Sequence, residues 1–394
     1  MTERELFFRH LGLPSFKPLG LEIGKAEGIY LYDTSGKKYI DLVSGVSVSN
    51  LGHGNPQVID AIQRQLGNYL YVNVYGEFIL SPQVRLAEKL ITVLPPELSS
   101  IYLVNSGSEA VEGAIKLARR YSGRTEIISF NNAYHGSTLG ALSILGNESL
   151  KNAFRPLIPD TRIIRFNNAG DLEKITRKTA CVICETIQAE AGMILPATGF
   201  LPQLRDRCTE TGTLLIVDDV QMGFGRTGKM FSFENFDIIP DILVLAKAMG
   251  GGMPIGAFIS SKEIMDTLAF QPELGHITTF GGHPVSCAAS IASIEILTSG
   301  NIIEQVNEKG RRIFDSIAHH PVIKEIRWKG LAMGVEIKDP ELHNRLTGLM
   351  ISNGIIIDWF LFKPDTFRIA PPLIITNDEI DLCCDLLLKS LNEV

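Results

Sequence analysis

Residues 214–230, LLIVDDVQMGFGRTGKM, and residues 240–257, PDILVLAKAMGGGMPIGA, decide the fold of this chain. Each contains a short apolar run, Leu214–Val217 or Ile242–Ala246, which is uncharged and bounded by polar or glycine-rich turns. Such runs are typical of parallel strands that are buried on both faces of a sheet. We therefore expect two buried strands, with Asp218 at the end of the first and Lys247 at the end of the second.

Strand and helix patterns alternate on both sides of this stretch. Further strands are predicted at 101–104, 126–130, 162–166, 181–184 and 255–259, and helices at 108–121 and 201–211. This alternation favours an open, mostly parallel α/β sheet with helices on both faces. Ligands of such sheets bind outside the carboxyl ends of the strands, where Asp218 and Lys247 both fall.

The flanking regions predict a second, smaller α+β domain. A β-hairpin is expected around Asp33–Gly36, strands at 329–337 and 365–375, and a final helix at 377–392, while helices at 56–66 and 81–94 precede the sheet of the large domain. We expect residues 1–55 to form an N-terminal arm and hairpin that belong to the small domain. Residues 56–299 should form the large α/β domain, and residues 300–394 the rest of the small domain.

Composition excludes several classes of function. The net charge of −7 comes with no basic stripe, which argues against a nucleic-acid partner. No apolar run reaches the roughly 18 residues that span a bilayer, and the N-terminus does not resemble a signal peptide. The six cysteines are expected to be reduced thiols of a cytoplasmic protein. Cys181 and Cys184 lie within one strand with no second pair at zinc-site spacing, so no metal site is predicted.

Asp218 and Lys247 are suited to pyridoxal phosphate. A lone carboxylate at the end of a buried strand is costly unless a cation meets it. A lysine amine forms a Schiff base with the cofactor aldehyde, and an aspartate holds the pyridine nitrogen protonated so that the ring acts as an electron sink. Alternatively, Asp218 caps a helix and Lys247 is a solvated loop residue.

Two motifs on the same sheet edge could hold such a cofactor. In NSGSEA (105–110), Ser106 and Glu109 have capping-box spacing, and Gly107 and Ser108 leave N–H groups free at the positive end of a helix. Many helices begin this way with nothing bound. Tyr134, in the next motif, could stack on a planar ring or simply be a core residue.

A further group of polar residues could serve the substrate. Glu185 and Glu190 follow the strand at 181–184, and they could be general acids, solvated charges or partners of a buried cation. Arg368, in the apolar stretch FRIAPPL, needs an anion and is a candidate partner. Gln221 could donate a hydrogen bond to the cofactor's phenolic oxygen.

Taken together, these residues resemble the class III pyridoxal-phosphate aminotransferases, the ω-aminotransferase group. The resemblance rests on NSGSEAVEGAIKLAR, AYHGSTLGALS, ETIQAEAG, LLIVDDVQMGFGRTGKM, DILVLAKAMGGGMPIGA, TTFGGHP and FRIAPPL, which occur in the family's order and spacing. It implies a fold type I transferase that forms a homodimer with active sites at the subunit interface. Within the group, the sequence most resembles the ornithine, acetylornithine and putrescine-type aminotransferases.

The resemblance also implies roles for single residues. Lys247 becomes the Schiff-base lysine and Asp218 the partner of the pyridine nitrogen. Glu190 and Arg368 match a gated pair in which the arginine receives a substrate α-carboxylate and the glutamate shields it otherwise. The cofactor-binding residues implied are Gly107, Ser108, Tyr134, Glu185, Asp218, Gln221, Lys247 and, reaching the neighbouring subunit's cofactor phosphate, Thr279.

The expected activity is transfer of an amino group from an ω-amine, such as a diamine, an ornithine-type donor or an ω-amino acid, to a keto acid, with 2-oxoglutarate preferred. One departure favours pyruvate instead: Ser137 stands where many members carry an arginine that binds a second carboxylate. The same fold could also serve an aminomutase, a decarboxylase or a regulator that senses a ligand.

Overall fold

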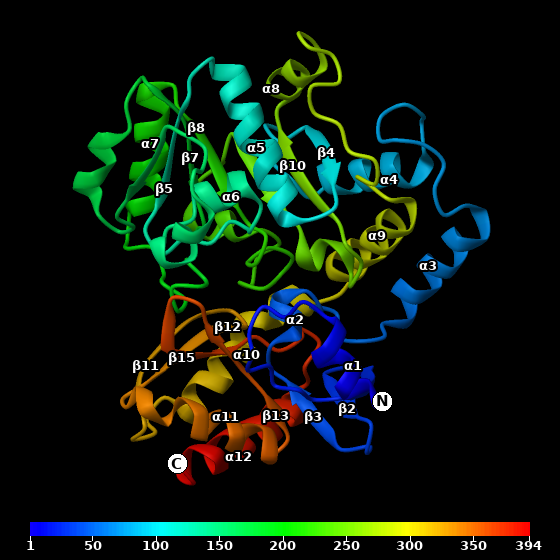
Figure 1. The fold of residues 1–394 in the computed structure, drawn as a ribbon, viewed down its shortest axis with the longest axis vertical. Coiled ribbons are helices and arrows are strands. Elements are labelled where there is room, and N and C mark those ends of the chain that lie inside the picture. The colour runs from blue at the N-terminus through cyan, green and yellow to red at the C-terminus, as the bar shows by residue number, and fades with distance from the viewer.

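The computed structural model describes all 394 residues, which are organised around three sheets (Figure 1). The largest has seven strands in the order β4-β10-β9-β8-β7-β5-β6. These strands are β4 (Ser100–Val104), β5 (Glu126–Phe130), β6 (Thr161–Ile164), β7 (Thr179–Cys184), β8 (Leu214–Asp218), β9 (Ile242–Leu245) and β10 (Gly256–Ser260). Only β10 runs against its neighbours, because it pairs antiparallel with both β4 and β9. The predicted open, mostly parallel α/β sheet is confirmed.

Strand β8 shows why apolar and polar residues do not alternate along these runs. Its Leu214 and Ile216 belong to the hydrophobic cluster that includes helix α5 (Gly107–Ser122). Leu215 and Val217 point to the opposite face and join the cluster that includes helix α7 (Phe200–Thr211). Helices therefore cover both faces of the sheet, and every residue of β8 is buried. Cys181 and Cys184 of β7 divide between the same two clusters, as expected for residues three apart in a strand.

The N- and C-terminal parts of the chain form the lower half of the molecule in Figure 1. One four-stranded sheet has the order β1-β2-β3-β13 and the other β11-β12-β15-β14. The strands are β1 (Ile23–Glu27), β2 (Tyr30–Asp33), β3 (Lys38–Asp41), β11 (Ile323–Lys329), β12 (Ala332–Ile337), β13 (Ile355–Ile356), β14 (Asp358–Phe360) and β15 (Lys363–Ile369). The predicted hairpin is β2–β3, and β13 pairs with β3 in parallel. This pairing supports the proposed grouping of residues 1–55 with 300–394 as one small domain.

Besides α5 and α7, the chain forms ten further α-helices. They are α1 (Glu3–His10), α2 (Ser44–Ser47), α3 (Pro56–Asn68), α4 (Ser81–Ile91), α6 (Leu139–Ser143), α8 (Lys262–Asp266), α9 (Pro284–Ser299), α10 (Ile302–Ile317), α11 (His343–Ser352) and α12 (Asn377–Asn392). Two of them, α3 and α4, correspond to the helices predicted at 56–66 and 81–94. The final helix at 377–392 is confirmed. By length and composition, no single helix could cross a membrane, although the bent pair α9 and α10 passes that test when taken together.

Two of the strands predicted near the C-terminus are wrong in extent. Residues 329–337 form a turn and strand β12, because the chain reverses at Gly330, whose φ of +61° is left-handed. Residues 365–375 leave the sheet after Ile369, since Pro371 and Pro372 cannot donate backbone hydrogen bonds to a neighbouring strand. Strand β1, before the hairpin, was not predicted.

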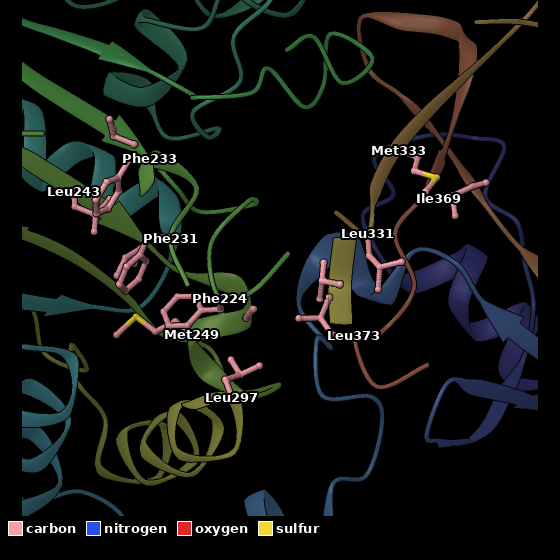
Figure 2. Packing of buried hydrophobic residues seen from close by; sticks show 14 of the residues in the cluster. Phe224, Phe231, Phe233, Leu243, Met249, Leu297, Leu331, Met333, Ile369 and Leu373 are labelled. Carbon is pink, nitrogen blue, oxygen red and sulfur yellow. The ribbon is translucent and has the colours of Figure 1, made fainter. Parts of the chain in front are cut away.

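One large hydrophobic cluster extends from the large sheet into the C-terminal part of the chain. Figure 2 shows Phe224, Phe231 and Phe233 on one side, and Leu331, Met333, Ile369 and Leu373 on the other. Arg226 lies between these regions and is fully buried. Its Nη1 donates to the carbonyls of Leu331 (2.8 Å) and Pro371 (2.6 Å), and its Nη2 to Asn50 Oδ1 (2.6 Å). The chain segments that flank the candidate site are thus joined by one buried guanidinium.

Candidate active site

The carboxyl ends of the parallel strands bring the predicted polar residues to one edge of the sheet. Asp218 ends β8, and Lys247 follows β9 by two residues. Three other polar segments follow β4, β5 and β7 at the same edge. They contain Gly107 and Ser108, Tyr134 and His135, and Glu185 and Glu190. A cavity of about 570 Å³ opens there, and its lining includes Gly107, Ser108, Tyr134, Glu185, Asp218, Gln221 and Lys247.

Lys247 presents its amine to this cavity from a constrained backbone. Its φ of +50° is left-handed, which is uncommon for a residue other than glycine and often marks a functional site. The amine donates to Gln221 Oε1 at 3.2 Å. Burial lowers the pKa of Lys247 from its ordinary 10.5 to about 8, with Glu190 opposing and Arg368 adding to the shift. A larger share of this amine is therefore neutral and nucleophilic at neutral pH than that of a solvated lysine.

Asp218 is held by a residue that sequence analysis did not single out. His135 Nδ1 lies 2.7 Å from Asp218 Oδ2, and the N–H of Val220 donates to Oδ1 at 3.1 Å. The His135 side chain is fully buried and its Nε2 has no partner. Since an ionised carboxylate only accepts, Nδ1 carries the proton and fixes the orientation of Asp218. The signal was present in the motif Tyr134-His135-Gly136, from which only the tyrosine was chosen.

The start of α5 forms a cradle of backbone N–H groups. The helix begins at Gly107, one residue earlier than predicted, so that Gly107 and Ser108 are both in the first turn. Ser106 Oγ accepts from the N–H of Glu109 at 3.2 Å. The expected reciprocal capping box is wrong, because the Glu109 carboxylate instead accepts from the N–H of Asn105 at 2.8 Å.

Glycines allow the chain to pass close to this cradle. A Cβ on Gly107 would lie 2.9 Å from Val220 Cγ1, and one on Gly136 would lie 2.4 Å from Ser108 Oγ. Gly136 also has a φ of +127°, which disfavours other residues. The space beside the Ser108 N–H therefore stays open, as an anion site at a helix N-terminus requires.

Tyr134 and Glu185 are linked through the backbone. The Glu185 carboxylate accepts from the N–H groups of Tyr134 and Ala189, each at 3.0 Å. Burial raises the pKa of Glu185 to about 7, and the electrostatic effect of His135 opposes this shift. The Tyr134 hydroxyl lies 3.1 Å from Ser137 Oγ. Glu185 thus connects the turn after β5 to the loop after β7, and Tyr134 is half-buried at the wall of the cavity.

Arg368 and Glu190 form the predicted ion pair, and Arg368 has a second carboxylate partner. Arg368 Nη2 donates to Glu190 Oε1 at 2.6 Å, and both residues are buried. Arg368 Nη1 donates to Asp358 Oδ2 at 2.8 Å, which no sequence pattern indicated. The guanidinium also lies 4.5 Å from the ring centre of Phe360, which packs in one cluster with the cavity residues Ile187 and Met222. Phe360 therefore connects the guanidinium to apolar residues of the cavity wall, although neither Arg368 nor Glu190 lines the cavity itself.

Three predicted site residues, Glu190, Arg368 and Thr279, do not line the cavity, and Thr279 is the one of them that is exposed. It lies in the loop before α9. Its neighbour Thr278 faces inward instead, and Thr278 Oγ1 accepts from Asn105 Nδ2 at 3.2 Å.

The whole chain is similar in sequence and in fold to known proteins. The chain matches the model of the aminotransferase class-III family over residues 14–391. It is 39% identical over 385 residues to the acetylornithine aminotransferase of Methanopyrus kandleri, covering 97% of this chain and 96% of that protein. The ornithine aminotransferase of Toxoplasma gondii superposes with a TM-score of 0.91 at 29% identity, covering 99% of this chain and 94% of that one. The ω-transaminase of Pseudomonas jessenii in complex with PMP gives 0.92 at 26% identity, covering 100% and 98%.

Proposed function

Because the chain belongs to the class-III aminotransferases, a family of pyridoxal-phosphate-dependent transaminases, we propose that it transfers an amino group from an ω-amine to 2-oxoglutarate. The donor would be a diamine, an ornithine-type compound or an ω-amino acid. The observation that carries the proposal is the meeting of Lys247, Asp218 and the N-terminus of α5 at one cavity of about 570 Å³.

The residues around this cavity fit pyridoxal phosphate. The glycines at 107 and 136 keep open the cradle that would receive the phosphate at the Gly107 and Ser108 N–H groups. Asp218, oriented by His135, would pair with the pyridine nitrogen. Tyr134 would lie against the ring, Gln221 would contact the phenolic oxygen, and Glu185 would fix the turn that carries Tyr134. When bound, the cofactor supplies an electron sink for loss of a proton from the substrate carbon.

Lys247 is proposed as the covalent attachment point and as the base that moves the substrate proton. Its Nζ, with a pKa lowered to about 8, can both release and accept a proton near neutral pH. Gln221 orients this amine through the 3.2 Å contact. The test is to load the protein with cofactor, add an ω-amine, and then add a keto acid. Loss and recovery of the cofactor's visible absorbance would support transamination, whereas release of CO₂ would indicate decarboxylation instead.

Glu190 and Arg368 are proposed to form a gate for the two substrates. In the structure Glu190 pairs with Arg368, as an ω-amine without a nearby α-carboxylate would require. Its Oε2 also accepts from the N–H of Leu361 at 3.1 Å, so the shielding position is held by two contacts. An α-keto acid would displace the Glu190 carboxylate and pair with Arg368 in its place.

The acceptor has a second candidate, because Ser137 is the residue that faces Tyr134 where an arginine would be expected. A dicarboxylate needs a second cation, since a desolvated and unpaired carboxylate is expensive. The matched test follows the aminated cofactor form as each keto acid is added separately. If pyruvate reacts more than about tenfold faster than 2-oxoglutarate, a difference of roughly 1.4 kcal/mol, the proposed acceptor is wrong. Ser137→Arg should then shift the ratio back toward 2-oxoglutarate.

A homodimer is proposed on the basis of an exposed apolar surface made of two loops. Their contact is shown by Tyr71, whose ring centre lies 5.1 Å from that of Phe280. The exposed residues of this surface include Leu70, Phe78, Ile79, Leu274, Ile277 and Phe280. Thr279 lies within it and would reach the partner's cofactor phosphate.

The surface is tested by measuring molecular mass in solution. Phe280→Asp should convert a dimer to a monomer and weaken cofactor retention, because a second copy would no longer supply Thr279. The control is Leu382→Asp on α12, a similarly exposed apolar residue outside the surface. A wild-type monomer, or a Phe280→Asp protein that stays dimeric, would contradict the proposal.

A further inference from the structure

Arg368 is held by two carboxylates and still has a donor to spare. Nη2 donates to Glu190 and Nη1 to Asp358, whereas the buried Nε has no acceptor. Asp358 lies on β14, directly across the sheet from Arg368 on β15. Its Oδ1 is buried without a partner, and the side chain as a whole is 31% exposed.

Two carboxylates contact the one guanidinium of Arg368. The single positive charge of Arg368 faces the two negative charges of Glu190 and Asp358. Among the next charged groups, Asp41 is negative, whereas Lys247 and Arg226 are positive. Burial raises the pKa of Asp358 to about 6, with Glu190 and Asp41 adding to the shift and Arg368 and Lys247 opposing it. Asp358 therefore remains mostly ionised above pH 7.

The free donor shows where a carboxylate would bind. Arginine pairs best with carboxylates through two parallel N–H bonds. Departure of Glu190 would free Nη2 beside the unpartnered Nε, which together form such an edge. Asp358 would stay on Nη1, since it does not occupy this edge. An incoming α-carboxylate would therefore meet a guanidinium whose charge is already shared.

We propose that Asp358 is a positioning residue that acts through Arg368: it orients the guanidinium and at the same time weakens its affinity for an α-carboxylate. The consequence is discrimination in favour of amine donors that lack an α-carboxylate. This inference rests on the proposed function, because it takes Arg368 as the α-carboxylate subsite.

The test compares wild type with Asp358→Asn, using cofactor-loaded protein and propionate as an unreactive carboxylate probe. The amide oxygen of asparagine can still accept from Nη1, so orientation is kept while the charge is removed. We expect propionate to bind about tenfold more tightly, which corresponds to roughly 1.4 kcal/mol. Asp365→Asn is the matched control, because Asp365 lies on the same strand as Arg368 but pairs with Lys363 at 2.7 Å. Its propionate affinity should equal that of wild type.

Donor kinetics give a second measurement. The ratio of kcat/KM for n-butylamine to that for L-alanine should fall about tenfold in Asp358→Asn and stay constant in Asp365→Asn. Unchanged or weaker propionate binding in Asp358→Asn would overturn the proposal, since a purely structural role predicts loss of affinity and not gain. Should Asp358→Asn fail to fold, Asp358→Ser is measured by the same criteria.

The role of Asp358 can be tested independently of the donor class. If wild type does not transaminate n-butylamine or any other ω-amine, the proposed donor class is wrong. The propionate titration still decides the role of Asp358 in that case, because it requires no turnover.

Discussion

Replacement of Glu190 by alanine is the most direct test of the gate. In the structure, the Glu190 carboxylate is bound to Arg368 at 2.6 Å, and both side chains are almost fully buried. Removing one partner of a buried ion pair typically costs about 3–5 kcal/mol, because the other charge is left uncompensated. Here Arg368 keeps its contact with Asp358 at 2.8 Å, so the remaining cation is not left alone.

We therefore expect a smaller cost, of about 2 kcal/mol, when an ω-amine occupies the Glu190→Ala site. An α-amino acid avoids this cost, because its own carboxylate takes the place of Glu190 on Arg368. The ratio of kcat/KM for an ω-amine to that for an α-amino acid should consequently fall by roughly 30-fold.

The assay measures kcat/KM for n-butylamine and L-alanine with saturating keto acid, for wild type, Glu190→Ala and the control Glu341→Ala. Glu341 is exposed in the turn before α11 and has no ion pair in the structure. The control should match wild type. A ratio that moves less than about threefold in Glu190→Ala would refute the gate.

Three further predictions concern the cofactor site. Lys247→Ala should abolish transamination while cofactor still binds weakly by equilibrium dialysis, since the change removes an amine but little packing; turnover near the wild-type rate would refute the assignment. Asp218→Asn should retain cofactor yet slow turnover by roughly a thousandfold, because a neutral amide cannot hold the charge that Asp218 and His135 are arranged to support. An unchanged kcat would exclude this role. Covalent capture of cofactor by the apoprotein should accelerate with pH, reach half of its maximum near pH 8 and level off about one unit higher, because burial lowers the pKa of Lys247 to about 8 and only its neutral amine reacts. Stopped-flow absorbance measures this, and a rate still rising above pH 9.5 would contradict the lowered pKa.

The sequence by itself determined the large sheet and the edge at which the site lies. The runs at 214–217 and 242–246 are apolar at every position, which is typical of strands buried on both faces of a sheet. Their ends carry Asp218 and Lys247, and parallel strands place those ends at one edge. Most of the proposed cofactor residues could be found in this way because each follows its strand within a few residues.

The tertiary structure alone decided which side chains meet. His135 and Asp218 are 83 residues apart, and Glu190 and Arg368 are 178 apart, so no local pattern encodes either distance. Asp358 reaches Arg368 only because β14 and β15 pair in a particular register. A one-residue change of register would turn Asp358 to the other face of the sheet. Strand pairing between distant or irregular segments depends on the packing of the whole chain, and the second partner of Arg368 could therefore be found only in the folded protein.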